Sequence, residues 1–457
     1  MALIKCCAVV LAAFWVAPRG ASGAGPVTLR EVPRVGETTR ASVSLKAEGL
    51  YRPASPPGSA AKDGPKPLAL KVETRLEFVE RVLAVDAGGR PSRSGRRVLR
   101  AGSAVNGGIR PQAATLRPSV ALLVAEPRSE GVVVWSPLGP LTRSELELVQ
   151  GPGDPLALEG LLPVRPVEPG DRWKVGDSAA RALTAYDVIG SNGLEATLAA
   201  VDGATATVKL KGEVRGSVLG GEGTMAVDGS YTFDLKAGRV SALAVDRRET
   251  RGAGPVEAGL DVKGSLVLDR RAEGAVPTEL TDETLGRLGL DKADPSREFL
   301  LLDSPDGTWS LTHDRDWHTY WDDPRLTLLK RLDRGEVVAQ CNLSKGPQAG
   351  QGRHQDTEQF RADVRKGLGE RFVQFLGAGE LDGDPAGHFR YKVGVQGRQG
   401  DVGVLWYYDL VASPAGDQVV ATFTLAASRQ KSFGDEDERL IKTFRWKPAA
   451  DAGVTGR

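Results

Sequence analysis

Cysteine is scarce in this sequence of 457 residues. Two of the 3 cysteines, Cys6 and Cys7, lie near the N-terminus, so Cys341 alone remains in the body of the chain. One cysteine cannot form an internal disulfide, so the fold must be stabilised by its apolar core. The strand-like residues around Cys341 predict a buried structural thiol, because free cysteine is among the most buried residue types.

Charge of one sign is also missing, since 60 Lys and Arg are balanced by 59 Asp and Glu. This balance creates no overall field for nucleic acid, and we expect no nucleic-acid partner.

The chain has no G-x-S-x-G, H-E-x-x-H or G-x-x-x-x-G-K motif, and no C-x-x-C beyond the N-terminus. These motifs would indicate familiar hydrolase, metal, nucleotide and redox chemistries. We therefore predict no cofactor and a role that is not enzymatic.

Long apolar runs are absent beyond the N-terminus, where residues 119–125 form one of the longest. A membrane-spanning helix needs about 20 apolar residues, so we expect no transmembrane segment in the mature chain. The N-terminus has Lys5, an apolar run over 6–17 and a small-residue stretch ending at Ala24. This order is typical of a secretory signal peptide. We expect residues 1–24 to be removed and the protein to be exported to the periplasm or the cell exterior.

Strict alternation of apolar and polar residues predicts a β-rich domain over residues 25–271. The inward positions are even in 204–218 and odd in 222–235. Such alternation indicates long antiparallel strands with one apolar face. We expect a curved sheet that forms a half-barrel or a sandwich, because the apolar face must be covered. Glycine at inward positions suits sharp curvature or the close approach of another layer. These glycines are Gly212, Gly216, Gly229 and Gly264.

Three local features interrupt this pattern. Residues 52–67 are rich in proline and predict a disordered insert. Residues 88–100 carry five arginines without interleaved aromatics, which predicts a solvated hairpin end rather than a polyanion-binding tip. The apolar phase of 68–78 flips at Val79, which indicates a bulge.

Residues 272–297 contain Pro277 and Pro295 and predict a linker between domains. All 4 histidines follow this segment, and the pattern changes to mixed helix and strand. We place a second domain at 298–447 and a disordered tail at 448–457. Strands are expected at 298–303, 307–313, 325–331, 335–343, 388–397, 402–411 and 417–427.

Two helices are expected in this second domain. Asp356 caps the first helix, whose apolar stripe runs from Phe360 to Phe372 and which closes near Gly377. The second helix covers 435–444 and starts with acidic residues, as the helix dipole favours.

Residues 298–447 resemble the PsbP-type fold of exported accessory proteins. The resemblance rests on the strand at 304–311, the following Asp316-Trp317, the central helix and the closing strands at 404–410 and 419–425. It implies an α/β/α sandwich around an antiparallel sheet and a family that is mostly non-catalytic, and it carries over no ligand residue.

The N-terminal part resembles uncharacterised exported β-rich proteins of bacteria through the stretch at 161–173. The curved sheet is also similar in outline to LolA-like periplasmic lipoprotein carriers. This second similarity is one of fold alone.

Candidate metal ligands gather in residues 313–323. His313, Asp316 and His318 have the chemistry to bind zinc or another divalent ion. On one strand, however, His313 and His318 have opposite parity and face opposite sides, so only a loop between them could bring them together. We therefore predict that they flank a buried Trp317 and bind no metal.

The leading hypothesis is an exported binding or accessory protein of the cell envelope that is not an enzyme. Its partner would be an apolar ligand in the N-terminal sheet or an envelope protein. One alternative is a metal-dependent enzyme centred on 313–323, and another is a purely structural envelope component. An open apolar cavity would favour ligand carriage, whereas convergent His and Asp would favour catalysis.

Overall fold

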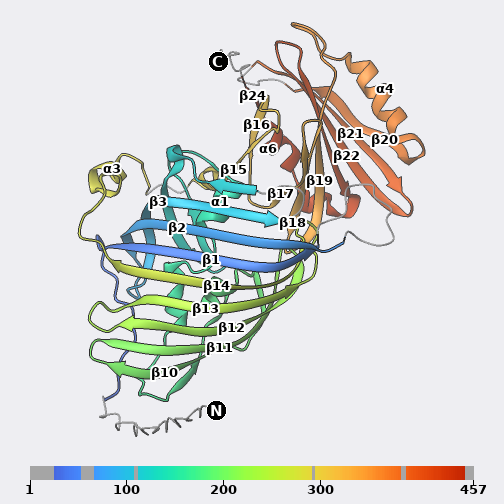
Figure 1. Cartoon of the computed structure of the whole chain (residues 1–457). Helices are drawn as coiled ribbons and strands as arrows, with labels where there is room; N and C mark the ends of the chain where they lie inside the picture. Colours follow the sequence, from blue (N-terminus) through green and yellow to red (C-terminus); the bar gives the residue numbers. More distant parts are fainter. Residues whose placement is uncertain (1–24, 53–65, 108–111, 291–293, 382–386, 448–457) are drawn as a thin grey trace, which may run out of the picture.

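The computed structural model describes residues 25–52, 66–107, 112–290, 294–381 and 387–447 (Figure 1). The expected signal peptide at 1–24, most of the insert at 52–67 and the tail at 448–457 lie outside these residues.

The N-terminal part forms one open antiparallel sheet of 13 strands. The strand order is β6-β5-β3-β2-β1-β14-β13-β12-β11-β10-β8, with β4 beside β3 and β9 beside β11. The predicted long, curved antiparallel sheet is confirmed (Figure 1). The strands are β1 (Thr38–Arg52), β2 (Leu68–Val85), β3 (Pro91–Gly107), β4 (Gln112–Thr115), β5 (Leu122–Arg128), β6 (Gly131–Trp135), β8 (Arg172–Lys174), β9 (Val188–Asn192), β10 (Glu195–Asp202), β11 (Thr205–Val218), β12 (Gly221–Asp234), β13 (Arg239–Arg251) and β14 (Gly259–Ala272).

Short helices cover part of the apolar face of this sheet. They are α1 (Arg143–Val149), η2 (Pro155–Leu161) and α2 (Asp177–Thr184), and each places buried leucines against the strands. A capping box starts α1, because Thr142 and Glu145 each accept a hydrogen bond from the other's backbone N–H. The main core therefore lies between the long sheet and these helices.

Two inward glycines show the two roles expected from the sequence. A Cβ at Gly264 would lie 2.1 Å from the carbonyl oxygen of Lys46 on the next strand, so only glycine permits the curvature there. A Cβ at Gly216 would lie 2.5 Å from the ring of Tyr186, which packs directly on the strand backbone. Curvature and close packing of another layer both require glycine in this sheet.

The phase change at Val79 arises because the sheet is covered on both faces at this point. Phe78 and Val79 are each 1% exposed, and they belong to separate cores on opposite faces. The second core includes Leu280 and packs beside α3 (Asp282–Gly286), so part of the segment at 272–297 lies on the sheet. A bulge does occur nearby, at Leu99 of β3.

The arginines of residues 88–100 differ in exposure, and Arg90 and Arg100 are exposed whereas Arg96 is not. Arg96 is buried, donating to Glu80 at 2.8 Å and to both carboxylate oxygens of Asp154 at 2.7 Å. Burial alone would lower the pKa of Arg96, but the two carboxylates raise it above its ordinary value. The expected solvated hairpin end is found at the turn itself, where Arg90 is exposed, but not along β3, where carboxylates pair with Arg96 and Arg97.

The C-terminal part forms a sheet of seven strands in the order β17-β18-β19-β23-β22-β21-β20. Helix α4 (Thr357–Leu368) packs on one face, and α5 (Gln430–Phe433) and α6 (Glu436–Lys442) pack on the other. This is the α/β/α layering expected from the sequence. Cys341 lies in the core as predicted, and burial raises the pKa of its thiol. The strands are β17 (Trp317–Asp323), β18 (Leu326–Asp333), β19 (Glu336–Lys345), β20 (Phe372–Glu380), β21 (Phe389–Gln399), β22 (Val402–Ala412) and β23 (Gln418–Ala426).

The helix that Asp356 caps is shorter than expected. It ends at Leu368, because Gly369 adopts a φ of +54° and the chain turns there. Phe372 then begins the edge strand β20, which pairs with β21, so the prediction of a helix reaching Gly377 was wrong.

A small third sheet joins the two parts of the chain. Its order is β24 (Arg445–Trp446), β16 (Trp309–His313), β15 (Leu300–Asp303) and β7 (Leu141–Thr142), and β7 runs parallel to β15. The seven-stranded sheet lies beyond one end of the long strands (Figure 1). Lys330 donates there to the carbonyl of Pro255 at 2.8 Å.

Among the described residues, no helix is long and apolar enough to cross a membrane.

Candidate functional site

The candidate metal ligands at 313–323 lie on two strands of different sheets. His313 ends β16 and His318 belongs to β17, with a turn between them. The parity argument was therefore wrong, because it placed both histidines on one strand. Both imidazoles are buried, and burial lowers the pKa of His313 to about 4 and that of His318 to about 3, with a further contribution from nearby Arg143.

These residues do not assemble a metal site in the part of the chain described here. Asp316 is exposed and lies 3.6 Å from the guanidinium of Arg331. No group of three or more His, Cys, Asp or Glu among the described residues could hold a metal ion. Arg143 of α1 instead donates to the carbonyls of Arg315 and Trp317, at 2.6 and 2.9 Å. The turn thus contributes to the junction between the two parts of the chain.

An apolar cavity of about 180 Å³, which we call the inner cavity, lies on the apolar face of the long sheet. It occupies the end of the strands nearest the C-terminal part, and its lining includes no described residue of α1 or α2. Several of its apolar side chains, including Leu45, Leu70 and Leu260, are only half-buried. Its lining comprises Leu45, Lys46, Ala47, Leu70, Val72, Met225, Arg247, Glu249, Leu260, Val262 and Gly264.

A larger cleft of about 870 Å³ adjoins the inner cavity and shares Val72 with it. It lies between α1 and strands β2 to β4, and its lining is mixed in polarity. Glu147 of α1 faces into it and is accessible to solvent. The surrounding protein nevertheless raises the pKa of Glu147 by desolvation. The cleft and the inner cavity together offer the volume that a small ligand needs, typically about 300–1,000 Å³.

Charged side chains interrupt the apolar lining along β13. Leu243 and Val245 are buried on the inward face, but the next inward positions are Arg247, Glu249 and Arg251. Sequence reasoning missed these residues. The signal that could have found them is the change from apolar to charged at inward positions of one alternating strand.

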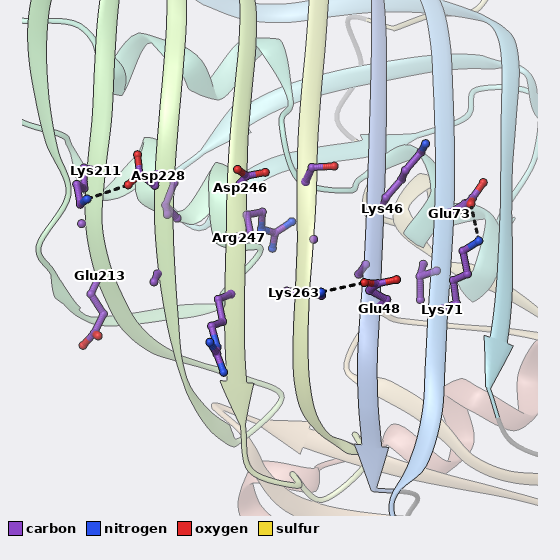
Figure 2. A pocket seen from close by; sticks show the side chains of 18 residues that line it. Lys46, Glu48, Lys71, Glu73, Lys211, Glu213, Asp228, Asp246, Arg247 and Lys263 are labelled. Atoms are coloured by element: carbon purple, nitrogen blue, oxygen red, sulfur yellow. Dashed lines mark ion pairs between the residues drawn. The ribbon is translucent and has the colours of Figure 1, made fainter. Parts of the chain in front are cut away.

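The opposite face of the same sheet carries a polar groove of about 920 Å³, which we call the outer groove (Figure 2). Ion pairs line it, including Lys211 with Asp228 at 2.9 Å and Lys263 with Glu48 at 3.1 Å. These side chains are exposed, and such pairs contribute about 0–1 kcal/mol each. With both signs interspersed, the outer groove has no charge preference that would select a ligand.

The chain matches no protein-family model and no curated protein. It is similar to a solved structure from Bacteroides thetaiotaomicron VPI-5482, with 11% identity over 32% of this chain and 48% of that one, and a TM-score of 0.25. The chain thus spans about half the length of that protein. The cyanobacterial PsbP (CyanoP) of Synechocystis sp. PCC 6803 is 14% identical over 35% of this chain and 96% of that one, with a TM-score of 0.26. OccK7 (OpdD) of Pseudomonas aeruginosa has 10% identity and a TM-score of 0.14 over 86% of this chain and 98% of that one. TM-scores this low carry no argument about function.

Proposed function

We propose that this protein is an exported binding protein, not an enzyme, that carries an apolar ligand in the inner cavity. The observation behind the proposal is the half-exposed apolar lining at one end of the long sheet. An apolar sheet face is normally covered by another layer, and an apolar cavity with few polar groups is the usual form of a small-molecule site.

Export is part of this proposal and rests on the N-terminal sequence. The charged, apolar and small-residue regions of residues 1–24 have the order of a cleavable signal peptide. N-terminal sequencing of the protein isolated from its own cells should begin near residue 25. An intact Met1 on the accumulated protein would contradict export with cleavage.

An accessory role in the envelope is the second part of the proposal. The motifs at 304–311 and 404–410 and the layering of α4, the sheet and α6 support a PsbP-like assignment for the C-terminal part. In this view the C-terminal part closes one end of the ligand-binding sheet.

The binding proposal is tested by titrating the chain from residue 25 with the fluorescent apolar probe N-phenyl-1-naphthylamine. Leu260→Lys places a charge in the inner cavity and should weaken binding about 10-fold or more, since burying an unpaired charge is costly. Val267→Lys is the matched control, because Val267 is 43% exposed on the other face of the same strand. Absence of probe binding to the wild type, or equal binding by both variants, would contradict the proposal.

A further inference from the structure

Arg247 is a cation on the apolar side of the long sheet. Its strand neighbours in register are Gly264 of β14 and Val227 of β12. It lines both the inner cavity and the outer groove (Figure 2). The side chain is only half-buried by its exposed area. The protein surrounds it nonetheless, and burial lowers the pKa of Arg247. Solvent reaches part of this side chain although protein atoms surround it, so we infer that the guanidinium lies in a cavity and not in open solvent.

The guanidinium of Arg247 has no anionic partner among the described residues. Nε donates to the sulfur of Met225 at 3.2 Å and Nη2 donates to the carbonyl of Thr184 at 3.3 Å. A thioether is a weak acceptor, and a guanidinium carries five N–H donors. Several donors therefore remain for a ligand.

Other buried arginines of the same sheet are paired. Arg96 binds Asp154 at 2.7 Å, and Arg270 lies 3.1 Å from both carboxylate oxygens of Glu31. Buried charges are normally paired, because an isolated one is costly to desolvate. The absence of such a partner sets Arg247 apart from Arg96 and Arg270.

The nearest carboxylate along β13 belongs to Glu249, which lines the same cavity and attracts Arg247 electrostatically but forms no ion pair with it. Glu249 lies 3.6 Å from Arg251, and Arg251 also reaches Glu257 at 3.9 Å. The hydroxyl of Tyr186, which interacts electrostatically with Arg247, is buried without a hydrogen-bond partner. The cavity thus combines apolar walls with a cation that forms no ion pair with a described carboxylate.

We propose that the ligand of the inner cavity is a long-chain carboxylate whose head group binds Arg247 and whose alkyl chain packs among Leu45, Leu70 and Leu260. This inference rests on the proposed function. A planar guanidinium matches a carboxylate in a bidentate geometry. The adjoining cleft gives space for the part of the chain that exceeds the cavity.

The test compares dodecanoate, dodecanol and dodecylamine as ligands of the chain from residue 25, by isothermal titration calorimetry. The wild type should bind dodecanoate about 10-fold or more tightly than dodecanol, because hydrogen bonds to charged groups contribute about 1.5–3 kcal/mol. Arg247→Gln should remove this preference, because dodecanoate binding should weaken about 10-fold or more. Arg247→Lys should retain much of it, since the charge is kept.

Arg248→Gln is the matched control, because Arg248 follows on the same strand and lines the outer groove without lining the inner cavity. It should behave as the wild type. Equal affinity of the wild type for dodecanoate and dodecanol would overturn the carboxylate inference while leaving apolar carriage intact. Binding of none of the three ligands would contradict the proposed function itself. If Arg247→Gln fails to fold, the selectivity of the wild type and of Arg247→Lys decides the question.

Discussion

Gly220 of the β11–β12 hairpin packs directly against Gly335 of the β18–β19 hairpin. A Cβ at Gly220 would lie 2.3 Å from the carbonyl oxygen of Gly335, so the contact is between two backbones. The first hairpin belongs to the long sheet and the second to the C-terminal sheet. This contact and the hydrogen bond from Lys330 to Pro255 hold the C-terminal part at the end of the strands where the inner cavity lies.

Substitution of Gly220 by alanine should separate these hairpins. Gly220 also has a φ of +82°, so Gly89, with a φ of +78° and no atom near its Cβ position, is the matched control. Gly89→Ala should cost only the backbone strain, about 1–2 kcal/mol. Gly220→Ala should cost clearly more in urea unfolding and should increase proteolysis between the two parts. Equal costs for the two variants would show that the contact contributes little.

Trp317 should anchor the edge of the C-terminal sheet. It is 1% exposed on edge strand β17 and packs edge-on against Phe423, with ring centroids 6.1 Å apart. Trp317→Ala should lower the free energy of unfolding by about 3–5 kcal/mol. Trp321→Ala on the same strand, at a side chain that is 39% exposed, should cost much less. Similar losses for both tryptophans in chemical denaturation would contradict an anchoring role.

His313 and His318 should make the protein less stable in acid. Both are buried as neutral imidazoles, with pKa values of about 4 and about 3 against an ordinary 6.5. The unfolded chain therefore binds more protons over this range, so stability is full above pH 6.5 and falls as the pH decreases toward 4. The loss is about 1.4 kcal/mol per pH unit for each histidine. Replacing both by Gln should flatten this slope in urea unfolding measured from pH 7 to 4.5. An unchanged slope would show that these imidazoles do not cause it.

Asp409 should have the opposite pH dependence. Its carboxylate is buried with neither oxygen hydrogen-bonded, and burial together with the charge of Asp437 raises its pKa to about 7. Because the folded state holds this proton more tightly, stability is lost as the pH rises from about 4 through 7. Asp409→Asn should therefore stabilise the protein at pH 8 by roughly 2–4 kcal/mol and change little at pH 4. The exposed Asp401→Asn is the control, and equal stability of the two variants at pH 8 would contradict the prediction.

The periodic features of this chain were readable from sequence, since they arise from short-range geometry. Alternation of apolar and polar residues indicates strands with one apolar face, because successive side chains of a strand point to opposite faces. This pattern predicted the long antiparallel sheet. Asp356 and the spacing of Phe360, Val364 and Leu368 likewise predicted α4 and its buried stripe. Arg96 and Arg97 show the limit of such reasoning, because their partners Asp154 and Glu279 come from segments far along the chain.

The candidate sites depended on tertiary structure. Whether His313 and His318 meet depends on the turn that sends β16 and β17 into different sheets, and local parity contains no information about that turn. Sequence reasoning missed Arg247, although its strand changes there from apolar to charged residues at inward positions. Only the fold shows that Glu249 lies 3.6 Å from Arg251 and that Arg247 lines a cavity without forming an ion pair among the described residues. The periodicity of apolar residues predicts the face of the strand on which a side chain lies. The residues that contact this side chain come from segments far apart in the chain, so only the tertiary packing determines them.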